Sequence, residues 1–170
     1  QGTAPAAAWR VEQGIDFGRF PIVDTGEVYV IHEGHDDVAG GVVALDTNGT
    51  VRWKRELGEY PAGAALGPNH LFLSMITNGI ADDGDRFHAL RRGDGETDWT
   101  HGDVGNGDGY YADSAVAGES VIVCGGTSDE GGFITAYTLD GQRRWTRTVD
   151  TEVRDIAPVD NRIIAVAEGG

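Results

Sequence analysis

The chain has 170 residues, of which 27 are glycine and 5 are proline, and its acidic residues outnumber its basic ones by 28 to 13. This length is enough for one domain with a sizeable core, and no apolar run approaches the ~20 residues that cross a bilayer as a helix. The formal net charge of −15 disfavours nucleic acid as a partner, because its phosphates would meet like charge.

The chain begins with a segment that carries the first of four evenly spaced tryptophans. Trp9, Trp53, Trp99 and Trp145 are separated by 44, 46 and 46 residues. A period of this size is typical of repeat proteins, in which a small unit recurs and packs against its neighbours. Residues 1–13 are predicted to be the outer strand of a unit whose first three strands are absent from this stretch.

Three whole units follow, and each contains four short runs rich in β-branched and aromatic residues. Glycine, asparagine or aspartate separates the runs, which is the pattern of strands joined by turns. The predicted units are residues 14–58, 59–104 and 105–150, and residues 151–170 supply the inner strands of a further unit. Residues 1–170 are therefore expected to form a single repeat region.

The third and fourth runs of each unit are joined by a recurring glycine turn. Asn48-Gly49, Asp94-Gly95 and Asp140-Gly141 each place glycine four residues before a tryptophan, and such pairs favour tight hairpins with positive φ. No stretch keeps a helical period over ten positions. The sequence predicts an all-β protein, a β-propeller of four-stranded antiparallel blades with a period of about 45 residues. A β-sandwich is the alternative, and the regular spacing argues against it.

The segment from Ala89 to Trp99 resembles the tryptophan-docking motif of quinoprotein-type (PQQ-like) propeller repeats. Alanine, glycine and tryptophan also recur from Ala44 to Trp53 and from Ala136 to Trp145, although the threonine that the family places before the glycine is missing. The resemblance implies that Trp9, Trp53, Trp99 and Trp145 pack between adjacent blades. A large ring that buries roughly 150–250 Å² suits that role.

The resemblance does not bring a cofactor with it. Quinone-dependent dehydrogenases of this kind use a calcium-binding carboxylate set, a catalytic aspartate and commonly a pair of adjacent cysteines. Here Cys124 is the only cysteine, and its apolar run predicts a buried strand residue.

Other members of the family that the sequence resembles are non-catalytic, among them scaffold subunits of outer-membrane protein assembly and surface proteins. We therefore expect a non-catalytic module that binds proteins, without PQQ. The alternatives are a fragment of a PQQ-dependent dehydrogenase and a structural subunit of a surface assembly.

The predicted strands do not close a ring. Three whole blades and two fragments leave three interpretations: a piece of a larger protein, two copies that share split blades in an eight-bladed ring, or a compact or open four-blade form. The exposed strand edges favour pairing with another chain. A protein partner or self-assembly is therefore expected.

The acidic composition points to a saline habitat. Lys54 is the only lysine, and an acidic excess in which arginine replaces lysine resembles the proteins of salt-loving archaea. High salt screens such charge over roughly 3 Å at 1 M. A location outside the cell or on its surface is expected.

Two acidic loops are candidates for binding a hard cation. Carboxylate oxygens are the ligands that calcium prefers, and the loops carry four such residues: Asp82, Asp83, Asp85 and Asp108. Neither loop has the spacing of an EF-hand. Solvated loops without a metal are the expected state, and calcium is the alternative.

A second candidate site lies where the first strand of each unit begins. In a propeller these positions line the central channel, and alignment of the units places Phe20, Gly63, Asp113 and Asp155 there. Arg19 and Arg154 directly precede two of these positions. The carboxylates and arginines are expected to form ion pairs near the axis, and a polar ligand or cation held between them is the alternative.

Overall fold

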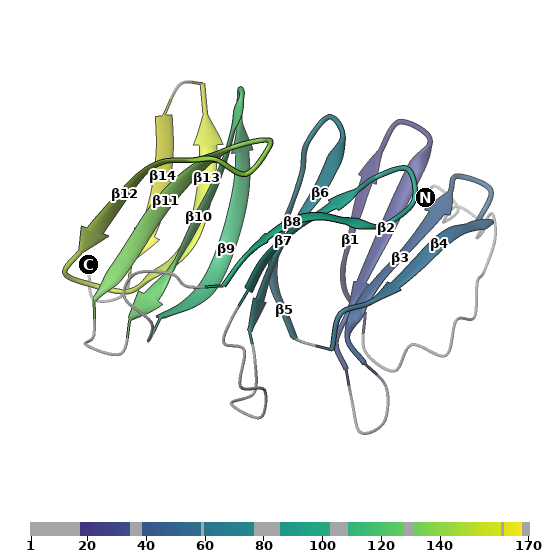
Figure 1. Cartoon of the computed structure of the whole chain (residues 1–170), viewed down its shortest axis with the longest axis horizontal. Coiled ribbons are helices and arrows are strands. Elements are labelled where there is room, and N and C mark those ends of the chain that lie inside the picture. The colour runs from purple at the N-terminus through teal and green to yellow at the C-terminus, as the bar shows by residue number, and fades with distance from the viewer. Residues whose placement is uncertain are drawn as a thin grey trace, which may run out of the picture. The chain divides into compact units, whose positions relative to one another are not determined.

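The computed structural model describes residues 18–34, 39–58, 60–76, 86–102, 109–127, 131–160 and 162–167. Within these ranges every regular element is a β-strand, and the strands form three antiparallel four-stranded sheets and one two-stranded hairpin (Figure 1). The predicted all-β fold of four-stranded antiparallel units is confirmed. In this part of the chain no segment forms a helix that could span a membrane.

The chain divides into two compact units, Gln1–Gly58 and Glu59–Gly170. The first unit contains the first sheet, in which strands adjacent in sequence are also adjacent in space. Its strands are β1 (Gly18–Asp24), β2 (Glu27–His32), β3 (Gly41–Asp46) and β4 (Val51–Glu56).

The second unit contains the second sheet, the third sheet and the last hairpin. The inner strand β9 of the third sheet contacts both β5 of the second sheet and β13 of the last hairpin. The second sheet comprises β5 (Tyr60–Leu66), β6 (His70–Ile76), β7 (Arg86–Arg91) and β8 (Thr97–His101). The third comprises β9 (Gly109–Ala117), β10 (Ser120–Thr127), β11 (Gly132–Thr138) and β12 (Arg143–Val149), and the last hairpin β13 (Val153–Val159) and β14 (Arg162–Ala167).

The glycine turns between third and fourth strands adopt the backbone conformation that the sequence predicts. Gly49, Gly95 and Gly141 have φ angles of 84°, 73° and 90°, which side chains with a Cβ rarely adopt. The residue before each glycine does not have a positive φ. The loop is therefore a turn closed by one left-handed glycine, and not the two-residue type I′ turn, in which both central residues have positive φ.

Each tryptophan of the described sheets lies directly opposite an alanine on the neighbouring strand. Directly after this pair, toward the turn, the fourth strand carries one extra residue, which makes a β-bulge. The pairs are Ala44 with Trp53, Ala89 with Trp99, and Ala136 with Trp145. The recurring alanine of the motif is thus a buried small residue that pairs across the strands with the tryptophan.

The inner strands share a second bulge. In each of the four hydrogen-bonded pairs between a first and a second strand, one residue of the first strand is left without a partner. The residues directly after the bulge are Phe20, Gly63, Asp113 and Asp155. These are the four positions that the sequence aligns, so they are equivalent in the fold. Their place on a central channel stays a prediction.

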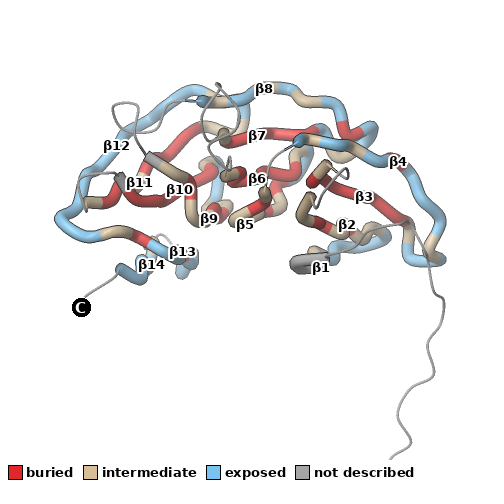
Figure 2. Tube along the Cα trace, turned by 90° about the horizontal axis from the view of Figure 1, so that it is seen from below, coloured by how far each residue is buried: buried red, intermediate tan, exposed pale blue. Residues whose placement is uncertain are grey.

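Two apolar clusters hold the second unit together. Aromatic rings dominate the cluster between the second and third sheets, including Phe72, Phe87, Tyr111 and Phe133. The cluster between the third sheet and the last hairpin is aliphatic and includes Cys124 and Ile156. Buried residues concentrate on the middle strands β6, β7, β10 and β11, whereas β12 and most of β14 are exposed (Figure 2).

Candidate functional site

Trp99 on β8 reaches from the second sheet to the turn between β11 and β12 of the third sheet. Its indole Nε1 donates a hydrogen bond to the backbone oxygen of Leu139 at 3.1 Å. A Cβ added to Gly141 would lie 2.8 Å from the ring of Trp99. The adjacent His101 stacks on Tyr137 with ring centroids 4.4 Å apart, and its Nε2 lies 2.8 Å from the backbone oxygen of Gly141. One indole and one imidazole therefore join two sheets at a glycine turn.

The other tryptophans have different surroundings. Trp53 is 8% exposed and its ring lies 5.8 Å from that of Tyr29 within the first sheet. Trp145 is 41% exposed, although its motif is the same. Trp9 lies outside the described residues. A role for the tryptophans in docking blades stays a prediction, and the contacts of Trp99 support it.

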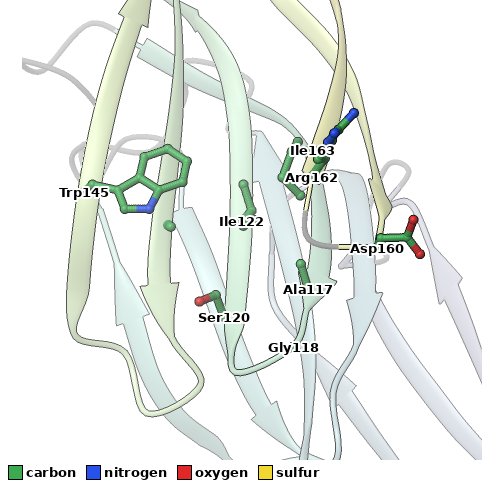
Figure 3. Close-up of a pocket in the computed structure, with 9 residues that line it drawn as sticks. Ala117, Gly118, Ser120, Ile122, Trp145, Asp160, Arg162 and Ile163 are labelled. Atoms are coloured by element: carbon green, nitrogen blue, oxygen red, sulfur yellow. The ribbon is translucent and has the colours of Figure 1, made fainter.

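The exposed Trp145 lines a shallow groove of about 230 Å³. Trp145 on β12 and Ile163 on β14 lie on either side of Ile122 (Figure 3). The remaining lining residues come from β11 and from the two hairpin turns with the strand ends beside them: Ala136, Ala117, Gly118, Ser120, Asp160 and Arg162. Sequence reasoning did not identify this groove.

Two carboxyl groups meet on the inner strands β9 and β13. The Oδ2 of Asp113 accepts a hydrogen bond from the backbone N–H of Ile156 at 3.1 Å, and the Asp113 carboxyl also hydrogen-bonds to that of Asp155. On the other side of Asp113, a Cβ added to Gly63 would lie 2.7 Å from the Cα of Asp113. The structure thus brings together three of the four positions that the sequence aligned.

Burial and the second carboxyl together raise the pKa of Asp113 to about 6. Burial is the larger cause, because it disfavours the charged form. The hydrogen bond to Asp155 and the negative charge of Asp155 act in the same direction, and the backbone N–H of Ile156 opposes them. A raised carboxyl pKa next to a second carboxyl marks a candidate functional site.

Cys124 lies buried on β10, opposite Asp113. Burial raises the pKa of its thiol to about 12, and the nearby carboxylates add to the effect. The thiol therefore stays protonated at neutral pH and is a poor nucleophile. The predicted interpretation of Cys124 as a small buried strand residue is confirmed.

We expect the carboxyl pair to make stability depend on pH. The pKa of Asp113 is raised from 3.8 to about 6 in the folded state, so the folded state binds the proton more tightly than the unfolded state. The contribution of Asp113 is thus fully present below pH 3.8 and is lost as the pH rises through about 6. The variant Asp113→Asn keeps an acceptor for the Ile156 N–H but has no carboxyl at this position. Its stability should therefore lack the part of the pH dependence that comes from Asp113.

The measurement is the free energy of unfolding of both proteins across this pH range. The wild type should lose stability relative to Asp113→Asn as the pH rises. Parallel curves for the two proteins would show that the carboxyl pair does not form in solution.

The remaining predicted site residues are only partly placed. The Nε of Arg154 lies 2.8 Å from Glu152, so Arg154 makes an ion pair with that residue. The calcium candidates Asp82, Asp83, Asp85 and Asp108 lie outside the described residues, as does the side chain of Arg19. Within the described ranges no three His, Cys, Asp or Glu residues are grouped as a metal site. Solvated loops without a metal, and calcium as the alternative, both stay predictions.

Sheets of four antiparallel strands, each with a tryptophan on its fourth strand, define the chain as a set of propeller repeats. A family model described as outer membrane protein assembly factor BamB matches residues 4–169, so the chain belongs to this family of PQQ-type repeats. No curated protein matches the chain.

Solved structures share the fold at low sequence identity. BamB from Moraxella catarrhalis is 22% identical, with a TM-score of 0.59 over 85% of this chain and 41% of its own. BBS1N in complex with ARL6DN is 14% identical, with a TM-score of 0.60 over 89% of this chain and 44% of its own. The chain therefore spans less than half the length of either structure, and these likenesses concern the fold alone.

Proposed function

We propose that the chain is a non-catalytic propeller module that binds other proteins, in a secreted or cell-surface protein of a halophile. The observation that carries this proposal is the exposed apolar face of the last hairpin. Val159, Ile164 and Val166 are 45%, 55% and 56% exposed. Strand pairing places them on one face, because Ile164 and Val166 alternate along β14 and Val159 is opposite Arg162.

The opposite face of the same hairpin packs against the third sheet. Ile156 and Ile163 make these contacts. Among the described residues, the hairpin thus has one covered face and one exposed apolar face. Contiguous apolar patches of this kind mark surfaces where proteins meet. Membership of a family described as an assembly factor agrees with a scaffold role, although fold alone does not decide function.

The enzymatic alternative has less support among the described residues. The Cys124 thiol is buried and protonated, and the Asp113 carboxyl is already hydrogen-bonded to the Ile156 backbone N–H and to Asp155. A dehydrogenase would need quinone and calcium ligands from residues that are not described here. Titration with PQQ and Ca²⁺ separates the two functions, since a bound chromophore would support the dehydrogenase.

Site-specific photo-crosslinking in the native host tests the proposal. A photoreactive amino acid in place of Val166 should give an adduct of defined mass with another protein, because this side chain faces out from the apolar surface. The matched control is the same replacement at Thr100, an exposed strand residue of the second sheet. If Val166 gives no adduct, or Thr100 gives the same adducts, the last hairpin is not a binding surface.

Salt dependence tests the halophilic part of the proposal. A net charge of −15 on 170 residues repels itself in dilute buffer, and molar salt screens that repulsion. The melting temperature should therefore rise markedly between dilute buffer and molar KCl. A melting temperature that is unaffected by KCl would contradict a halophilic origin.

A further inference from the structure

The carboxyl pair lies where the first strands of two consecutive repeats meet. Asp113 on β9 and Asp155 on β13 are equivalent residues, because each directly follows the bulge of a first strand. The equivalent residue one repeat earlier is Gly63 on β5, and a Cβ added to it would lie 2.5 Å from Oδ1 of Asp113. The contact between β5 and β9 therefore has one carboxyl at this position, whereas the contact between β9 and β13 has two.

The hydrogen bond between the two carboxyls requires a proton. An ionised carboxylate can only accept hydrogen bonds, so one of the two groups must carry the proton that joins Asp113 to Asp155. The Oδ2 of Asp113 also accepts from the backbone N–H of Ile156 at 3.1 Å. Asp113 thus holds β13 through two hydrogen bonds, and one of them exists only while the pair keeps its proton.

Loss of the proton places two negative charges at this contact. Like charges at this separation disfavour the ionised pair, and the hydrogen bond between the carboxyls is lost with its proton. Burial adds to the cost because it disfavours charge, and together these causes raise the pKa of Asp113 to about 6. An arrangement in which the two carboxylates separate and meet water removes both costs.

The other charged and titratable groups around the pair leave this repulsion in place. Arg154 precedes Asp155, but it makes an ion pair with Glu152, and its charge is not among the causes that shift the pKa of Asp113. The Cys124 thiol, opposite Asp113 on β10, is protonated at neutral pH. Further titratable side chains on strands β5, β6, β9, β11 and β14 are those of Tyr60, His70, Tyr110, Tyr111, Tyr137 and Arg162. Their charges are likewise not among those causes, whereas that of Asp155 is.

We propose that Asp113 and Asp155 form a proton-dependent joint between consecutive repeats, closed while the two carboxyls share one proton and able to open once both are ionised. In the open joint, β13 separates from β9 at Ile156, and the proton has passed to solvent. Because proton release favours the open joint, opening becomes more frequent as the pH rises through about 6. This inference rests neither on the proposed protein-binding function nor on what covers the outer face of the hairpin.

Amide hydrogen exchange of Ile156 tests the joint, because its N–H is donated to Asp113. The full chain is measured by NMR between pH 4 and pH 8 in molar KCl, which screens the net charge but screens a buried pair much less. After correction for the intrinsic exchange rate, the protection factor of Ile156 should fall roughly tenfold or more. Amides of β6 and β7 should keep their protection. Constant protection of Ile156, or a parallel loss in β6 and β7, overturns the proposal.

Asp155→Asn should keep the joint closed throughout this pH range. The asparagine amide donates to Asp113 without a shared proton, and the second negative charge is gone. The protection factor of Ile156 should then stay nearly constant. Asp160→Asn is the matched control, since it removes the same charge from the turn between β13 and β14 and should respond to pH as the wild type does. Equal responses of the two variants would show that the pair does not control the joint and overturn the proposal.

Carbon-13 NMR of the carboxyl groups in the wild type gives a test that needs no variant. Two carboxyls that share a proton lose their protons in two separate steps, and the upper step lies well above the ordinary pKa of aspartate. Asp113 and Asp155 should both report the upper step, and it should coincide with the change in Ile156 exchange. Two titrations at the ordinary aspartate pKa of about 3.9, or an upper step without a change in Ile156 exchange, would refute the proposal.

Discussion

Replacing Trp99 with alanine is expected to lower the free energy of unfolding by about 3–5 kcal/mol. The indole contacts Phe72, Phe87 and Tyr137, donates a hydrogen bond to Leu139 and lies against Gly141. Its removal leaves a cavity between the second and third sheets and an unpaired carbonyl. Chemical unfolding of the full chain in high salt, followed by circular dichroism, measures the loss.

Trp145→Ala is the matched control for this experiment. The two tryptophans have the same motif and the same alanine partner on the neighbouring strand. Because Trp145 is 41% exposed among the residues that the structure describes, its loss should cost only about 1 kcal/mol. Similar losses from both variants would mean that Trp99 does not join the two sheets.

Gly141→Ala is expected to cost about 2–4 kcal/mol, for two separable reasons. The φ of 90° at Gly141 is unfavourable for any residue with a Cβ. The added Cβ would also lie 2.8 Å from the Trp99 ring, so that the indole or the turn must shift. The loss in free energy of unfolding is measured by chemical unfolding under the same conditions as for Trp99→Ala.

Gly118→Ala separates the two reasons. Gly118 also closes a hairpin turn, with φ of 59°, but nothing lies within 4 Å of its added Cβ. This variant should cost only about 1 kcal/mol, the backbone part alone. In the background of Trp99→Ala, the cost of Gly141→Ala should fall to that level, because the clash is relieved. An unchanged cost in that background would show that the indole does not press on the turn.

Much of the local structure could be predicted from residue type and spacing. Glycine at 49, 95 and 141 predicted turns with positive φ, and those angles are observed. The four aligned positions of the first strands proved equivalent, since each follows a β-bulge. The bulges were not predicted, because they depend on which residues of the second strand form hydrogen bonds. The type of glycine turn was not predicted either, because the Asn-Gly and Asp-Gly pairs indicate a positive φ at glycine but do not specify the φ of the residue before it.

The candidate sites were less predictable. Asp113 and Asp155 were identified as a related pair from alignment alone, but ion pairs with arginine were expected beside them. The structure hydrogen-bonds the Asp113 carboxyl to that of Asp155 and pairs Arg154 with Glu152. Ion pairs between these carboxylates and the arginines stay a prediction. Which of several nearby charges meet depends on side-chain placement at the strand ends, and spacing in sequence does not specify it.

The tryptophan period, the turn glycines and the strand patterns were enough to predict an all-β chain of four-stranded repeats. Strands and turns can be predicted in this way because each is set by residues that lie close together in the sequence. Only packing decided which tryptophan is covered and which is exposed. Trp99 meets its carbonyl partner 40 residues further along the chain, and Asp113 meets the Ile156 N–H 43 residues further along. The same local motif therefore joins two sheets at Trp99, whereas Trp145 is 41% exposed, since the residues that cover Trp99 lie 40 positions further along the chain.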